Sequence, residues 1–152
     1  MKSTTIQVLP ATAIHANGWR DLWDMYCAGA VASDVSDTTW RRILDTASPI
    51  GSVVAMLDDQ VVGLATYVEH ECTWETKSVC YIEDMIVGKL HRGPRLNVGH
   101  AMGVHLIGRL RSGEWSRLHC VTHADNILAQ KLYAQYAEGE PYVRYVMKGN
   151  KL

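Results

Sequence analysis

The chain has no phenylalanine among its 152 residues, so five tryptophans and seven tyrosines supply the aromatic part of any core. No apolar run approaches the roughly 20 residues that a membrane-spanning helix needs. The four cysteines lack Cys-x-x-Cys spacing, and the seven histidines lack His-Glu-x-x-His spacing. These absences argue against a membrane span, a metal site and a dithiol redox motif.

The N-terminal stretch also lacks the apolar region of a secretory signal peptide. Four unclustered cysteines without such a signal favour reduced thiols, and therefore a cytoplasmic protein. At 152 residues the chain is long enough to form a core without disulfides. We expect a single domain over residues 1–152 with no bound metal.

Charge is distributed unevenly along the chain although the net charge is only −1. Residues 1–84 carry twelve acidic and five basic side chains, whereas residues 85–152 carry four acidic and ten basic ones. The small net charge argues against general affinity for nucleic acid. The split favours an anionic cofactor on the C-terminal half and a cationic substrate on the N-terminal half. Two solvated faces that meet in the fold would explain it equally well.

Two adjacent carboxylates interrupt the apolar segment of residues 79–87, Val-Cys-Tyr-Ile-Glu-Asp-Met-Ile-Val. The segment reads as a buried strand, and an unpaired charge in such a strand is costly. Strict alternation puts Asp84 on the face of Ile82 and Ile86, and Glu83 on the opposite face. A carboxylate in partly apolar surroundings is a candidate general base because its pKa can rise. A salt-bridged or hydrogen-bonded structural pair is the alternative.

A basic loop from Lys89 to Gly99 follows this strand, and a helical pattern comes next, with an apolar stripe at Val98, Met102, Leu106 and Leu110. A strand, a glycine-containing loop and a helix N-terminus together form a common anion-binding arrangement. The loop is neither a Walker loop nor a dinucleotide fingerprint, because the required glycine spacing is missing. Many solvated turns share its composition.

Strands and helices alternate along the chain, which predicts an α/β domain with two or three layers. We expect Ser36 or Asp37 to cap the second helix, and Asp125 or Asn126 to cap the last. The expected strands cover residues 4–9, 52–57, 61–69, 79–87, 117–122 and 142–148, and the expected helices cover residues 14–29, 36–46, 97–111 and 126–137.

The last expected helix carries polar and small residues on one face, at Asn126, Ala129, Gln130 and Tyr133. A carboxamide, a small residue and a phenol on one face suit a ligand that passes along the helix. A tyrosine half-buried against a sheet is the common alternative.

The order of these parts resembles the GNAT superfamily of acetyl-CoA-dependent N-acetyltransferases over about residues 5–148. Residues 81–87 are similar to its fourth strand, residues 92–99 to its pyrophosphate loop, and Asn126-x-x-Ala-x-x-Leu-Tyr133 to its last conserved helix. Residues 18–26, Thr73-Trp74 and residues 142–145 resemble the yeast histone and polyamine acetyltransferase type. The Ile-Glu-Asp segment also resembles spermidine/spermine N-acetyltransferases.

The resemblance implies a central, mostly antiparallel mixed sheet of six to seven strands with about four helices on both faces. It implies transfer of an acetyl group from acetyl-CoA to a primary amine by direct attack in a ternary complex. A small cationic acceptor such as a polyamine, an amino acid or an aminoglycoside is expected, and a homodimer is among the expected states. The alternative is a catalytically silent module of the same fold that binds CoA or a protein partner.

The resemblance also implies roles for individual residues. Glu83 is the expected base, and Tyr133 the expected proton donor to the leaving thiolate. The expected cofactor-binding residues are Met85, Ile86, Val87, Arg92, Gly93, Arg95, Asn97, Val98, Gly99, His100, Asn126 and Ala129. The expected acceptor-binding residues are Trp23, Asp24, Trp74 and Asp84.

Two loop residues depart from the family pattern. Asn97 stands where the family usually has glycine, and Pro94 removes one N–H donor from the loop. Because asparagine tolerates the left-handed conformation, we expect Asn97 to replace the glycine there.

Overall fold

The computed structural model describes residues 5–149 as two units, residues 5–121 and residues 122–149, which we describe separately. The first unit contains β1 (Gln7–Pro10), η1 (Ala13–His15), α1 (Ala16–Cys27), α2 (Ser33–Leu44), β2 (Ile50–Leu57), β3 (Gln60–His70), β4 (Val79–Val87), η2 (Lys89–His91), α3 (Val98–Arg111) and β5 (Arg117–Cys120). The second unit contains α4 (Ile127–Tyr133). No helix within residues 5–149 is long and apolar enough to cross a membrane. The expected single domain, homodimer and cytoplasmic location stay predictions.

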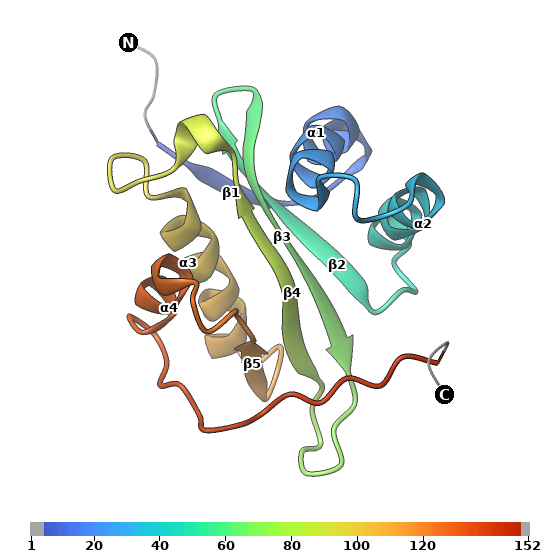
Figure 1. The fold of residues 1–152 in the computed structure, drawn as a ribbon, viewed down its shortest axis with the longest axis vertical. Coiled ribbons are helices and arrows are strands. Elements are labelled where there is room, and N and C mark those ends of the chain that lie inside the picture. The colour runs from blue at the N-terminus through green and yellow to red at the C-terminus, as the bar shows by residue number, and fades with distance from the viewer. Residues whose placement is uncertain (1–4, 150–152) are drawn as a thin grey trace. The chain divides into compact units, whose positions relative to one another are not determined.

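One sheet organises the first unit, with the strand order β1-β2-β3-β4-β5 (Figure 1). Strands β1 to β4 pair antiparallel, and β5 runs parallel to β4. The expected mixed, mostly antiparallel sheet is therefore confirmed. The predicted start of the first strand at residue 4 lies outside the described residues.

The expected count of six to seven strands is wrong, because residues 5–149 contain five. The missing strand is the one predicted over residues 142–148, which forms no regular secondary structure. Its large apolar side chains are exposed, with Tyr145 at 84% and Met147 at 87%. A β-rich composition alone does not make a strand, because a strand also needs a partner for its backbone groups.

The sheet has helices on both faces, as expected, with α1 and α2 on one side and α3 on the other (Figure 1). The two cores consist of residues that alternate along the strands. On the α3 side, the buried residues include Val98, Met102 and Leu106 of the predicted stripe, together with Val53, Ala55, Cys80 and Ile82. On the α1 side they include Trp19, Leu22, Trp23, Val54, Leu64 and Ile86.

A glycine on β3 brings the start of α3 against the sheet. A Cβ atom at Gly63 would lie 2.8 Å from Cγ1 of Val98, closer than real Cβ atoms approach their neighbours. Gly63 also pairs with Val87, the last residue of β4. The N-terminus of α3 is therefore held beside the end of β4.

Helix α2 begins at Ser33, earlier than predicted, so a cap at Ser36 or Asp37 is wrong. Ser36 is buried inside the helix, where its Oγ accepts the indole N–H of Trp23 at 3.0 Å and donates to the carbonyl of Ala32. Ser36 therefore accepts a tertiary hydrogen bond instead of capping the helix, a role that local sequence propensity does not predict.

Arg109 ties the C-terminal half of α3 to the sheet. Its guanidinium donates to the Tyr67 hydroxyl at 2.7 Å and, through Nε, to Glu114 at 2.8 Å. The same group lies over the rings of Tyr67 and Trp115, at 5.0 and 4.4 Å from their centroids. Hydrogen bonding to Arg109 lowers the pKa of Glu114, which shows that the charged pair is favoured.

We predict that Arg109→Ala lowers the free energy of unfolding by about 1–3 kcal/mol, because it removes the stacking and leaves the Tyr67 hydroxyl without its donor. Arg111→Ala is the matched control, since Arg111 is exposed on the same helix. Urea denaturation of both variants measures the difference. Equal stabilities would show that the network contributes nothing.

Candidate active site

Strands β4 and β5 form a fork. They pair only from Val79 opposite Arg117 to Ile82 opposite Cys120, where β5 ends. Strand β4 continues to Val87. In the part of the chain that the structure describes, no strand pairs with this outer edge of β4 beyond Ile82. Such an edge can bind an extended ligand through backbone hydrogen bonds.

The register shows which backbone groups point to the open edge. The N–H of Gly88 donates to the carbonyl of Val62 on β3 at 2.9 Å. Hydrogen-bonded positions alternate along an antiparallel ladder, so Ile86 directs its backbone groups to β3. Met85 and Val87 therefore direct theirs to the open edge, in agreement with their expected backbone role.

The position of Ile86 does not favour its expected cofactor contact. Its side chain is 2% exposed and packs with Trp19 and Leu22 on the α1 side. Its backbone is used by the ladder with β3. Val98 is likewise buried, so only its backbone N–H can serve a ligand.

A β-bulge changes the faces of β4 at Glu83. Strand β3 pairs Thr66 with Asp84, but its next residue pairs with Ile82, so Glu83 is the extra residue. Ile82 packs on the α3 side, whereas Asp84 lies two residues before Ile86 and so shares its face on the α1 side. The expectation that Asp84 shares a face with Ile82 is therefore wrong, because the extra residue breaks the alternation.

Glu83 is exposed and lies one residue beyond the last pair between β4 and β5. We expected Glu83 to lie in partly apolar surroundings, but the bulge leaves its carboxylate at the surface. Its position is what makes it a candidate base, because an accessible carboxylate at the fork can take a proton from a ligand bound along the open edge.

The loop after β4 contains two left-handed residues, Gly93 with φ 106° and Asn97 with φ 52°. The prediction that Asn97 adopts this conformation in place of glycine is confirmed. Helix α3 then begins at Val98, and its first ladder bond runs from the N–H of Ala101 to Asn97. The N–H groups of Val98 and Gly99 precede this bond, at the end of the helix where the dipole favours an anion.

The two loop arginines are exposed. Arg92 Nε donates to the carbonyl of Val87 at 3.0 Å and so ties the loop to the end of β4. The guanidinium carries further N–H donors that suit an anion. Arg95 lies three residues later in the same loop, and His100 lies half-buried in the first turn of α3.

Two expected acceptor-binding residues are engaged elsewhere. The ring of Trp23 is only 7% exposed and stacks on Trp19 at 5.2 Å, so it cannot receive a cation from solvent. The Asp24 carboxylate forms an ion pair with Arg20 at 2.9 Å, and Arg20 also holds Asp37. We therefore withdraw both expected contacts, because burial and charge pairing already use these groups.

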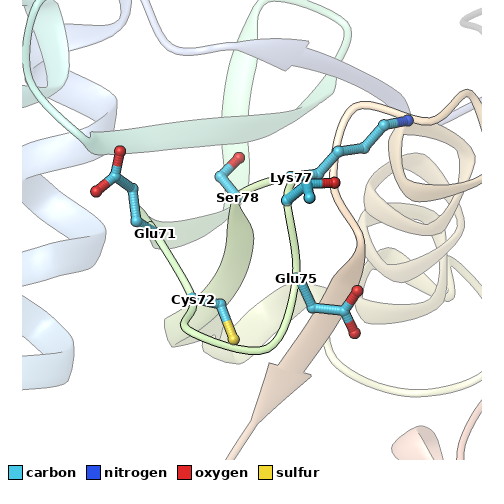
Figure 2. Close-up of a pocket in the computed structure, with 6 residues that line it drawn as sticks. Glu71, Cys72, Glu75, Lys77 and Ser78 are labelled. Carbon is cyan, nitrogen blue, oxygen red and sulfur yellow. The ribbon is translucent and has the colours of Figure 1, made fainter.

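Trp74 is 91% exposed in the loop between β3 and β4. That loop surrounds a hollow of about 200 Å³ (Figure 2), lined by Glu71, Cys72, Glu75, Thr76, Lys77 and Ser78. The Nζ of Lys77 donates to the carbonyl of Gly113 at 2.7 Å. The hollow lies where β4 begins, and the loop that leads into α3 follows the opposite end of the strand.

Asp84 is half-buried and accepts a hydrogen bond from the Thr66 hydroxyl. It also faces Tyr26 at the end of α1, where burial and the charge and hydrogen bonding of Asp84 raise the pKa of the phenol. Sequence reasoning did not find Thr66 or Tyr26 as site residues. No sequence signal marks them, because the bulge that brings Asp84 to this face is not visible in the pattern.

The second unit contains the remaining predicted residues. Asn126 Oδ1 accepts the N–H of Ala129 at 3.2 Å, so the predicted cap at Asn126 is confirmed. Helix α4 ends at the half-buried Tyr133, four residues earlier than predicted. Gln130 turns back within the unit and donates to the carbonyl of Ala124 at 2.8 Å.

Comparison with known proteins agrees with this geometry. Residues 17–137 match the model of the acetyltransferase (GNAT) family. The chain is 25% identical over 136 residues to the D-amino-acid N-acetyltransferase HPA3 of Saccharomyces cerevisiae, covering 86% of this chain and 83% of that protein.

Among solved structures, the aminoglycoside N-acetyltransferase AAC(6')-Iy in complex with CoA aligns with a TM-score of 0.79 and 19% identity over 95% of each chain. A ribosomal-protein-alanine N-acetyltransferase from Brucella melitensis aligns with a TM-score of 0.77 and 18% identity, over 95% of this chain and 99% of that one. At these identities the structures support the fold alone, whereas the family model spans most of the chain. The chain therefore belongs to the acetyltransferase (GNAT) family and is an N-acetyltransferase.

Proposed function

We propose that this enzyme acetylates a primary amine of a small cationic acceptor and binds acetyl-CoA along the open edge of β4. The fork is the observation that carries the proposal. An unpaired strand edge leads directly into a loop and helix N-terminus that suit an anion. The cofactor has the same two parts, because an extended amide chain is attached to a pyrophosphate.

The residues of the first unit fit this ligand mainly through their backbone. Met85 and Val87 would pair with the amide chain, and the N–H groups of Val98 and Gly99 would hold the pyrophosphate. The other proposed pyrophosphate contacts are Arg92, Gly93, Arg95, Asn97 and His100. In the second unit, the side-chain amide of Asn126 and the small side chain of Ala129 are proposed to accommodate the amide chain.

Proton movement is the main chemical task of the side chains. When bound, acetyl-CoA supplies the acetyl group as a thioester. An alkylammonium with a pKa near ~10 is not a nucleophile at neutral pH, so Glu83 is proposed to remove its proton, directly or through water. The N–H of Met85 at the open edge is proposed to stabilise the developing oxyanion. Tyr133 is proposed to donate a proton to the leaving thiolate. No residue of the enzyme is acetylated on this route.

The acceptor does not follow from the relatives. Their names specify D-amino acids, aminoglycosides and a ribosomal-protein alanine, which are chemically different amines. We retain Asp84 and Trp74 as proposed acceptor contacts, since one is a half-buried carboxylate and the other an exposed aromatic ring.

Isothermal titration with acetyl-CoA tests the cofactor site. We predict that the wild type binds and that Gly93→Ala binds about tenfold more weakly, because alanine is strained at a φ of 106°. Gly108→Ala is the matched control: a Cβ atom meets no neighbour within 4 Å at either position, and Gly108 has no positive φ. Binding equal to the wild type in both variants would remove the loop from the site, and no binding by the wild type would refute the proposal.

Thiol release over a panel of primary amines tests the base. We predict turnover by the wild type, and a rate roughly a hundredfold lower at neutral pH for Glu83→Gln. The remaining activity should rise toward higher pH, because the amine must then lose its proton unaided. Glu83→Asp keeps a carboxylate and should keep the wild-type pH profile. An unchanged profile in Glu83→Gln would exclude this residue as the base, and binding of acetyl-CoA without turnover of any amine would contradict the proposed reaction.

Tyr133→Phe tests the proton donor. We predict that kcat falls by roughly a hundredfold while the Kd for acetyl-CoA is unchanged, because only the hydroxyl is lost. A leaving thiol with a low pKa departs as a stable thiolate and needs no proton donor. A chromogenic acetyl thioester of such a thiol should therefore restore much of the rate of Tyr133→Phe. A kcat equal to that of the wild type would assign the role to another group or to water.

A further inference from the structure

The carboxylate of Asp84 is held by the neutral hydroxyl group of Thr66, and the phenol of Tyr26 lies near it. Thr66 is 3% exposed, lies opposite Asp84 on β3, and donates its hydroxyl hydrogen bond to Oδ2. Tyr26 approaches from the C-terminal end of α1. The carboxylate therefore has a defined position at the junction of β3, β4 and α1.

The charge of Asp84 has no counter-charge within residues 5–149, where no lysine, arginine or histidine forms an ion pair with it. Four other acidic side chains of the first unit have a cationic partner, since Asp24 and Asp37 share Arg20, and Glu69 and Glu114 lie within 4 Å of Arg109. Burial raises the pKa of the nearby Cys27 thiol, and the negative charge of Asp84 raises it further. A carboxylate that is partly removed from water is stabilised further by a cationic partner. A bound ligand can supply it.

The bulge separates the two neighbouring carboxylates. Glu83 is exposed at the fork, while Asp84 lies on the α1 face, so the two groups do not occupy one site. Consecutive Cα atoms are only about 3.8 Å apart, so one small molecule can reach both groups. A single ammonium at Glu83 would leave Asp84 uncompensated.

We propose that Thr66 and Tyr26 are specificity-determining residues, which hold Asp84 as the contact for a positively charged group of the acceptor other than the amine that reacts. This inference rests on the proposed function. The Thr66 hydroxyl fixes the direction of the carboxylate without neutralising it, because it is an uncharged donor, and the phenol of Tyr26 is proposed to support the same direction from α1. They are positioning residues, and Asp84 makes the contact.

The experiment compares n-butylamine with putrescine, which has the same carbon chain and a second amine. We expect wild-type kcat/KM to favour putrescine by roughly tenfold to hundredfold, the value of a charge-assisted hydrogen bond. Putrescine has two equivalent amines, so its kcat/KM is divided by two before the comparison. The preference should fall toward one in Asp84→Asn and should fall in part in Thr66→Val and Tyr26→Phe. The loss should appear in KM for putrescine more than in kcat.

Two variants separate positioning from folding. Thr66→Ser keeps a hydroxyl at this buried position and should keep the preference for putrescine. If Thr66→Val instead acted only by disturbing the fold, the serine variant would not recover activity selectively with putrescine. Asp59→Asn removes an exposed carboxylate from the turn between β2 and β3 and should keep the wild-type preference. Thermal unfolding of each variant shows whether it is folded.

The outcomes distinguish this inference from the proposed function. Turnover of both amines with equal efficiency would overturn the role of Asp84 and leave the acetyltransferase reaction intact. A preference that survives in Asp84→Asn would also overturn it. A preference lost in Asp84→Asn but retained in Thr66→Val and Tyr26→Phe would overturn the positioning roles. Failure of the wild type to release thiol with these two amines would overturn this inference, and only failure with the whole amine panel, despite binding of acetyl-CoA, would overturn the proposed function as well.

Discussion

The site depends on one constraint, the extra residue in β4 at Glu83. Without the bulge, Asp84 would share a face with Ile82 and would place its charge in the apolar core beneath α3. With the bulge, Asp84 meets Thr66 across the strands, and Glu83 lies exposed where β5 ends. A single residue thus separates two adjacent carboxylates and gives each a different environment.

The frame around the fork is fixed at both ends of α3. At the N-terminal end, the absence of a side chain at Gly63 lets Val98 pack directly on β3. At the C-terminal end, Arg109 joins the helix to Tyr67 on the same strand. A helix held in this way presents its first-turn N–H groups in a fixed direction. Preorganised donors of this kind bind an anion without a large cost of ordering.

The two sides of the site are built from different parts of the chain. The proposed cofactor side uses backbone groups at the open edge and the helix N-terminus, which place few demands on side chains. Asn97 can therefore replace a glycine there, because it adopts the same left-handed conformation. The proposed acceptor side uses side chains such as Asp84, so its specificity can change while the fold and the reaction persist.

The sequence by itself determined what local chemistry controls: the strand of residues 79–87, the stripe of α3, the left-handed Asn97 and the cap at Asn126. These features depend on periodicity or on the conformational preference of a single residue. Only the tertiary structure decided the rest. The bulge is a register shift between β3 and β4, Trp23 is buried by its hydrogen bond and packing with distant residues, and residues 142–148 form no strand. Each of these depends on which segments meet, and such pairing is a long-range property that no local pattern encodes.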